Sequence, residues 1–214
     1  MKQLFWNTIT NPMREVLEGF MQSNLASSFY LAGGTALSLQ IGHRLSVDLD
    51  FFSPSEDIPS IRNVIEKTLA PFQFNLSDSS WGNLVYLVND VRVGFYGYGY
   101  PLVSPLVTVG NVRLANIQDI ALMKFDALLA RASRKDFYDL YFICQQITLR
   151  KLLDLSTQKY PYVRDFEVQV TKRLVYFDNA EEETNPVMLK VVDWHRVKNF
   201  FIEQAKTIEK GWLL

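Results

Sequence analysis

Apolar positions along the chain follow two spacings, and these divide it into helical and strand segments. Spacing of three and four residues predicts helices at residues 11–24, 61–69, 117–130 and again from Ser133 onward. Alternation with a period of two predicts strands at residues 47–52, 72–76, 84–88, 91–96, 106–109 and 112–114. The pattern therefore predicts an α/β (α+β) fold in which a mixed β-sheet is flanked by helices.

The last third of the chain has helical spacing only. It predicts helices at residues 163–176 and 193–210, separated by an acidic run at 178–183 that we interpret as a solvated loop. We expect a core at residues 1–146 and a C-terminal helical extension at 147–214, which either follows the core or packs with it as a single unit.

Residues 29–52 combine a glycine pair, a short helix and a strand. Gly33 and Gly34 follow an apolar segment and precede a helix predicted for residues 35–41, with Gly42 as its terminator. A strand that turns on glycines into a helix exposes N–H groups and the positive end of the helix dipole, which suits phosphate. A glycine pair at a strand-to-helix turn is, on its own, more often ordinary turn chemistry.

The strand at 47–52 carries two acids, Asp48 and Asp50, on one face, because successive strand residues point to opposite faces. Their α-carbons lie roughly 6.6 Å apart, so the side chains converge on a small cation, for which Mg²⁺ with substrate phosphates is suited. The alternative is the solvated face of an edge strand. Thirteen residues separate the glycine pair from Asp48, which fits one helix and a return to a neighbouring strand. That combination suits phosphoryl or nucleotidyl transfer.

A second informative segment begins at Lys124, which lies in a helix that is apolar on most sides. A buried ammonium needs an anion. Lys124 therefore extends to the surface, pairs with acids of the fold on the side of Asp126, or reaches a triphosphate. Ser133 and Asp136 fit a capping box, while Asp136 and Asp139 share one helix face. Both capping and catalysis fit Asp136.

Both segments resemble one known family. Gly-Gly-Thr-Ala-Leu at 33–37 and the run from Arg44 to Phe52 are similar to the signature of the AbiEii/AbiGii toxin family of nucleotidyltransferases, in the DNA polymerase β-like superfamily. The run from Lys124 to Leu140 resembles that family's Lys…Arg…(Arg/Lys)-Asp-x-x-Asp-Leu motif. The resemblance covers about residues 29–142.

The resemblance implies a Mg²⁺-dependent enzyme that moves a nucleotide from an NTP to an acceptor, with tRNA as the expected acceptor. It also implies the toxin of a toxin–antitoxin or phage-defence pair, whose antitoxin is a separate protein. Two other functions stay open: a nucleotidyltransferase that modifies a small molecule such as an antibiotic, and a degenerate module that binds NTP or a protein without turnover.

The resemblance also assigns roles to residues. It makes Asp48 and Asp50 catalytic metal ligands and adds Asp136 to the catalytic set. The nucleotide-binding residues it implies are Gly33, Gly34, Thr35, Lys124 and Asp139.

One departure from the superfamily lies in the strand at 91–96. A third carboxylate usually comes from such a strand, but on the face of Arg92, where we expect it, the chain has Gly94. Substrate phosphates and water then complete a Mg²⁺ shell, or Asp136 or Asp139 substitutes. The aromatic segment 96–100 either stacks a base or covers the edge of the core.

Composition narrows the class of protein. With 214 residues, 48% hydrophobic and 21% charged, the chain is neither disordered nor fibrous. A net charge of −1 provides no general attraction to nucleic acid, so any RNA contact needs a local basic patch. One cysteine, Cys144, excludes an intrachain disulfide, and no apolar run reaches the ~18 residues of a membrane span. We expect a cytoplasmic protein without a membrane partner.

Overall fold

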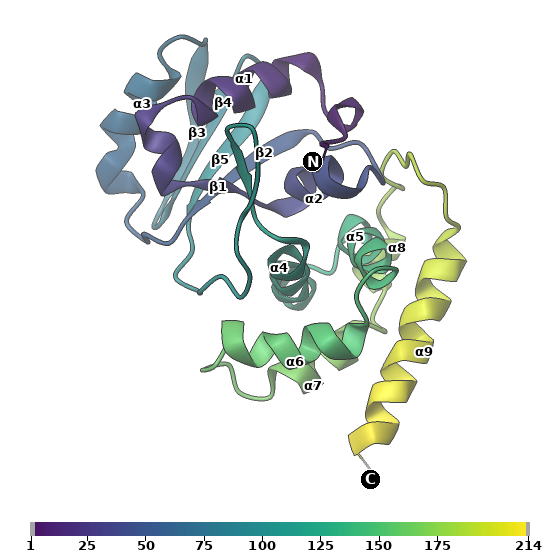
Figure 1. Cartoon of the computed structure of the whole chain (residues 1–214). Helices are drawn as coiled ribbons and strands as arrows, with labels where there is room; N and C mark the ends of the chain where they lie inside the picture. The colour runs from purple at the N-terminus through teal and green to yellow at the C-terminus, as the bar shows by residue number, and fades with distance from the viewer. Residues whose placement is uncertain (1–2, 213–214) are drawn as a thin grey trace. The chain divides into compact units, whose positions relative to one another are not determined.

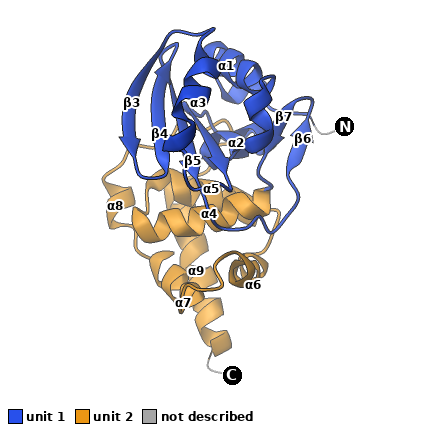
Figure 2. Ribbon diagram, turned by 90° about the vertical axis from the view of Figure 1, so that its left-hand side faces the viewer, with its two compact units in different colours: residues 1–116 blue, residues 117–214 orange. Residues whose placement is uncertain are grey.

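The computed structural model describes residues 3–212, which form two compact units. Met1–Asn116 holds the β-sheet, and the secondary-structure elements in the described part of Ile117–Leu214 are helices joined by loops (Figure 2). The boundary between these units, after Asn116, separates two compact parts of the chain. The boundary expected at 146/147 has a different meaning, because it separates a catalytic core from a C-terminal extension. That functional boundary stays a prediction.

The first unit is built on a mixed sheet with the strand order β3-β4-β5-β2-β1-β7-β6 (Figure 1). Strand β2 pairs in parallel with β5 and antiparallel with β1, and β1 is parallel to β7. Their bounds are β1 Tyr30–Leu31, β2 Asp48–Ser53, β3 Phe74–Ser80, β4 Asn83–Val88, β5 Val91–Gly97, β6 Val107–Val109 and β7 Val112–Leu114. The mixed sheet flanked by helices that the sequence predicts is confirmed.

An aromatic core covers one face of this sheet. Phe20 of helix α1 has its ring centroid 4.4 Å from that of Phe51 on β2 and 5.2 Å from that of Phe95 on β5. Because side chains alternate along a strand, Asp48 and Asp50 point to the opposite face. Helices of this unit are α1 Asn11–Met21, α2 Gly33–Ile41 and α3 Arg62–Leu69, with 3₁₀ turns η1 Trp6–Thr8, η2 Asn24–Ser28 and η3 Pro59–Ile61.

Helix α2 starts earlier than the sequence predicts. Gly33 and Gly34 are its first two residues and not a separate turn before it. Gly33 has a φ of +66°, a conformation that glycine adopts without steric cost and other residues adopt rarely. The predicted terminator, Gly42, is confirmed, with a φ of 64° at the C-cap.

The second unit contains α4 Ile117–Ala130, α5 Arg134–Cys144, α6 Leu149–Lys159, α7 Phe166–Arg173, α8 Asp178–Glu181 and α9 Trp194–Trp212. The solvated loop expected at 178–183 is wrong in part, since its first four residues form α8. Arg134 holds this segment by donating to the main-chain oxygen of Ala180 at 2.7 Å and to the carboxylate of Glu181 at 3.3 Å. Within the acidic run, Glu181 thus makes a structural contact with Arg134 of the same unit.

Candidate active site on strand β2

The carboxylates of Asp48 and Asp50 share one face of β2, where both residues are half-buried. The first turn of α2 lies against them: a Cβ placed on Gly33 would be 2.9 Å from Oδ2 of Asp50. The N–H groups of a helix's first turn have no carbonyl partner within the helix, and that end carries partial positive charge. The structure thus brings Gly33 and Asp50 together, as a site for phosphate beside a cation requires.

Two further contacts fix the start of α2 to the strand. A Cβ on Gly34 would collide with the guanidinium of Arg44, a buried side chain. Thr35 is fully buried; its hydroxyl donates to the main-chain oxygen of Asp48 and shares a 2.8 Å hydrogen bond with the hydroxyl of Ser46. Thr35 therefore has a positioning role in the fold, and direct contact of Thr35 with a nucleotide stays a prediction.

Strand β5 completes this face of the sheet. Its parallel register sets Arg92 opposite Asp48 and Gly94 opposite Asp50, so the expected position of a third carboxylate is occupied by glycine. The ring of Tyr96 covers Gly94, because a Cβ there would collide with it. Arg92 places Nη1 3.6 Å from Oδ1 of Asp50 and donates from Nη2 to the Tyr96 hydroxyl at 3.1 Å.

The electrostatics of this face follow from these contacts. Burial raises the pKa of Tyr96, and the negative charge of Asp50 raises it further. Burial opposes the charge on Arg92, but the Tyr96 hydroxyl and the two aspartates outweigh it and raise the pKa of the guanidinium. Tyr96 is therefore a neutral phenol and Arg92 a cation at neutral pH.

Asp48 and Asp50 suit Mg²⁺ by the chemistry of their donor atoms. Mg²⁺ usually takes one or two carboxylates from the protein and completes its shell with water and substrate phosphates. Within residues 3–212, no group of three or more His, Cys, Asp or Glu side chains gathers as a metal site. The pair therefore fits a cation that is shared with the phosphates of a nucleotide.

The second sequence segment forms a separate cluster in the helical unit. Lys124 of α4 places Nζ 2.7 Å from Oδ1 of Asp136 and 2.6 Å from Oδ2 of Asp139, both on α5. Both carboxylates are fully buried. Of the interpretations of Lys124, the structure contains the pairing with acids of the fold; reach to a triphosphate stays a prediction.

Asp136 is held by three donors. Besides Lys124, Arg131 binds it through Nε at 3.0 Å and through Nη2 at 3.2 Å, and the hydroxyl of Ser133 donates to Oδ2 at 2.7 Å. Burial alone would raise the pKa of Asp136, but the charges of Lys124 and Arg131 lower it to about 2. Ser133 is the N-cap of α5, yet its hydroxyl makes no capping bond to the helix backbone. The Ser133–Asp136 spacing thus produces a side-chain hydrogen bond in place of the predicted capping box.

Comparison with known proteins identifies the family. A family model described as "Nucleotidyl transferase AbiEii toxin, Type IV TA system" matches residues 15–78, which include Gly33, Asp48 and Asp50. Protein aq_aa25 of Aquifex aeolicus is 33% identical over 201 residues, covering 90% of this chain and 94% of that protein. The chain belongs to the AbiEii family.

Solved structures show that this AbiEii chain has the nucleotidyltransferase fold. JHP933 from Helicobacter pylori matches it with a TM-score of 0.58 and 19% identity, over 93% of this chain and 89% of that one. MenT4, a nucleotidyltransferase toxin from Mycobacterium tuberculosis, matches with a TM-score of 0.57 and 14% identity, over 91% and 83%. At these identities the likeness establishes the fold alone.

Aromatic rings of the AbiEii chain continue the carboxylate face beyond Asp50. The ring centroid of Phe52 lies 5.2 Å from that of Tyr96 and 5.6 Å from that of Tyr98, and Tyr98 lies 5.3 Å from Tyr100. Tyr96, Tyr98 and Tyr100 thus belong to one aromatic row. Base stacking and cover of the core edge both fit this row, so base stacking stays a prediction.

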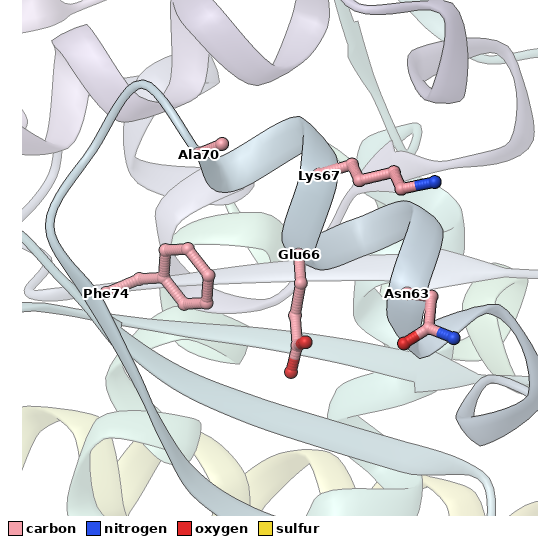
Figure 3. Close-up of a pocket in the computed structure, with 5 residues that line it drawn as sticks. All are labelled: Asn63, Glu66, Lys67, Ala70 and Phe74. Atoms are coloured by element: carbon pink, nitrogen blue, oxygen red, sulfur yellow. The ribbon is translucent and has the colours of Figure 1, made fainter.

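A pocket of about 410 Å³ lies elsewhere in the first unit of the AbiEii chain, between helix α3 and strand β3 (Figure 3). Its lining consists of Asn63, Glu66, Lys67, Ala70 and Phe74. Glu66 accepts from Arg62 at 2.7 Å and from the Tyr86 hydroxyl at 3.3 Å. The pocket contains none of the candidate site residues. The charge of Glu66 is already paired with that of Arg62, so we do not assign the site to this pocket.

Sequence reasoning missed Arg92 and Tyr96 as members of the site. The alternation of Val91, Arg92 and Val93 indicates which residues of β5 share a face. It does not indicate that Arg92 faces Asp48, because the register between β2 and β5 depends on the folded sheet. The tyrosines of segment 96–100 were noted in the sequence, but only for base stacking or for cover of the core edge.

Within residues 3–212, the AbiEii chain has no helix that is both long enough and apolar enough to cross a membrane.

Proposed function

We propose that the protein is a nucleotidyltransferase that moves a nucleotide from an NTP to an acceptor. The observation that carries the proposal is the packing of Gly33, at the start of α2, against the Asp50 carboxylate, with Asp48 on the same strand face. It unites a helix N-terminus suited to phosphate with two carboxylates suited to a cation.

The reaction breaks the bond between the α- and β-phosphates and forms a bond between an acceptor oxygen and the α-phosphorus. Pyrophosphate leaves, and the acceptor hydroxyl gives up its proton. In this chain, the N–H groups of Gly33 and Gly34 orient the phosphates, and Thr35 holds the helix start against Asp48. Asp48 and Asp50 would hold Mg²⁺, which supplies charge neutralisation for the triphosphate when bound.

The roles of Lys124, Asp136 and Asp139 rest on the family motif. We propose that Lys124 binds nucleotide phosphate, that Asp136 polarises the acceptor or supports the metal, and that Asp139 assists nucleotide binding. Lys124 would have to exchange its two carboxylates for phosphate to do so. Lys124→Ala tests this role: NTP affinity should fall, and unchanged affinity in a folded variant would contradict it.

The family's description and the name of MenT4 support a biological role as the toxin of a type IV toxin–antitoxin or phage-defence pair. We propose tRNA as the acceptor, a separate antitoxin protein as the partner, and the cytoplasm as the location.

A labelling assay tests the function. The protein is incubated with Mg²⁺, total tRNA and each α-labelled NTP in turn, beside Asp48→Ala/Asp50→Ala and the control Asp78→Asn, which changes an exposed acid of strand β3 in the same sheet. We expect label in RNA with the native chain and the control, and none with the double variant. Transfer that survives in the double variant would contradict the metal-ligand assignment.

A second candidate, an NTP-binding module without turnover, is favoured by one observation. Gly94 and the Tyr96 ring occupy the position where a third carboxylate is expected. Saturable NTP binding by calorimetry without transfer to tRNA or to small-molecule acceptors would support this candidate.

A further inference from the structure

We propose that Arg92 binds the triphosphate of the nucleotide, on the strand whose Gly94 replaces the expected third carboxylate, and that Tyr96 positions it. This role rests on the proposed nucleotidyl transfer and adds a residue to its site. Neither the family signature nor the second motif includes Arg92 or Tyr96.

The register between β2 and β5 places Arg92 beside the two acids. Arg92, Gly94 and Tyr96 alternate along β5 on the same face as Asp48 and Asp50, with Arg92 directly opposite Asp48. Paired neighbours on adjacent strands have side chains within reach of each other. The positively charged Arg92 therefore lies beside Asp48 and Asp50, on the strand where a third carboxylate was expected.

The side chains of Arg92 and Asp50 lie close together. Nη1 and Oδ1 are 3.6 Å apart, which is an ion pair but longer than a hydrogen bond. The Arg92 side chain is 52% exposed, and its hydrogen bond to Tyr96 uses one of the five N–H donors of a guanidinium. A cation bound between the carboxylates would compete with Arg92 for Asp50, because both neutralise the same charge.

Tyr96 supports the side chain of Arg92. Its ring covers Gly94, and its hydroxyl accepts from Nη2 of Arg92 at 3.1 Å. This contact engages Nη2, and Nη1 lies toward Asp50. A planar, half-exposed guanidinium suits phosphate oxygens, which it binds through two parallel hydrogen bonds.

Three positive groups would then act on the nucleotide phosphates: the start of α2, the cation held by the aspartates, and Arg92. A third carboxylate would add negative charge at this point, whereas a guanidinium adds positive charge. The site would thus need less metal charge to bind a triphosphate.

The test separates phosphate binding from metal binding. Sodium tripolyphosphate, a probe without a base, is titrated calorimetrically into the native protein, Arg92→Ala, Arg92→Lys and Tyr96→Phe in the presence of Mg²⁺. Mn²⁺ binding is followed in parallel by electron paramagnetic resonance. Arg62→Ala is the matched control, since Arg62 is also half-exposed, at 47%, and paired with an acid of the same unit, Glu66.

We expect Arg92→Ala to weaken tripolyphosphate binding by about tenfold or more, as loss of a charge-assisted contact predicts. Arg92→Lys should keep part of the affinity, and Tyr96→Phe should lose a smaller part. Mn²⁺ affinity should stay equal or rise in Arg92→Ala, because a competing cation has been removed. A general structural defect would instead weaken the binding of both tripolyphosphate and Mn²⁺.

Equal tripolyphosphate binding by the native protein and Arg92→Ala, in a preparation that transfers nucleotide, would overturn the role of Arg92 and leave the proposed function intact. Weaker binding of a single-stranded RNA without a triphosphate, at unchanged tripolyphosphate affinity, would also overturn it. No tripolyphosphate binding and no transfer by the native protein would overturn both proposals.

Discussion

Asp136 is a fully buried carboxylate whose charge is balanced by Lys124 and Arg131 and whose oxygens also accept from Ser133. Replacement of one partner in such a group leaves buried charge without compensation. Asp136→Asn should therefore lower the free energy of unfolding at pH 7 by about 3 kcal/mol, measured by urea denaturation.

The cost of Asp136→Asn should depend on pH. The pKa of Asp136 is lowered from 3.8 to about 2, so its ionised form stabilises the fold above pH 3.8 and loses this effect as pH falls toward 2. The stability difference between the native chain and Asp136→Asn should accordingly be constant near neutrality and shrink between pH 4 and pH 2. A difference that stays constant down to pH 2 would contradict the ion cluster as its cause.

Gly33 is the residue at which the helix start meets the candidate metal site. Gly33→Ala forces an alanine into a φ of +66° and sets its Cβ 2.9 Å from Oδ2 of Asp50. Backbone strain of this kind costs roughly 1–2 kcal/mol. We expect a lower melting temperature together with a loss of Mn²⁺ affinity, because Asp50 must move. Gly110→Ala is the control: its φ is +58°, but a Cβ there meets no neighbour within 4 Å, so stability should fall while Mn²⁺ affinity stays.

At the scale of elements, a buried ion pair joins helices α4 and α6. Nζ of Lys159 lies 2.9 Å from Oδ1 of Asp119, and both side chains are fully buried. Burial lowers the pKa of Lys159, against the opposing effect of Asp119. Lys159→Met removes the positive charge of the pair and leaves the buried charge of Asp119 without its compensation by Lys159. This variant should therefore destabilise the protein by about 3–5 kcal/mol.

The double variant Asp119→Leu/Lys159→Met removes both charges and should recover much of that loss, since apolar replacement of a buried pair is often close to neutral. Urea denaturation of the native chain, both single variants and the double variant measures the coupling. Additive losses in the double variant would show that the pair does not act as a unit.

Elements with a clear apolar period were predictable from the sequence. The alternation at residues 47–52 predicts strand β2 and the shared face of Asp48 and Asp50, and the helix period predicts α4 at its observed bounds. Helix α2 starts two residues earlier than predicted and ends where predicted. Its start was missed because glycines are weak helix formers, and whether Gly33 and Gly34 join the helix depends on contacts with Asp50 and Arg44.

Contacts between distant segments were not predictable. The pairing of β2 with β5 and the bond between Asp119 and Lys159 join residues about 40 positions apart, and local periodicity carries no information on such pairs. The same limit explains Ser133 and Asp136: their spacing was visible, but the partners Lys124 and Arg131 decided which hydrogen bond forms.

At the scale of the whole molecule, the fold and the activity should respond differently to metal removal. The buried ion pairs of the second unit and the aromatic contacts of both units join protein side chains to one another, and no group of three or more His, Cys, Asp or Glu side chains gathers within residues 3–212. Chelation with EDTA should therefore abolish transfer while the melting temperature stays unchanged, and added Mg²⁺ should restore transfer. A large fall of the melting temperature on chelation would indicate a structural metal and contradict the two-carboxylate site.

The most direct test of nucleotidyl transfer compares two positions of the label in one NTP. Parallel reactions contain the same NTP labelled at the α- or the γ-phosphate, with Mg²⁺ and total tRNA, and both the RNA and the released phosphates are analysed. The account predicts that α-label enters RNA and γ-label leaves as pyrophosphate, with both events lost in Asp48→Ala/Asp50→Ala. Entry of γ-label into RNA would show phosphoryl transfer, and α-label retained in the mononucleotide would show hydrolysis; either result would contradict the account.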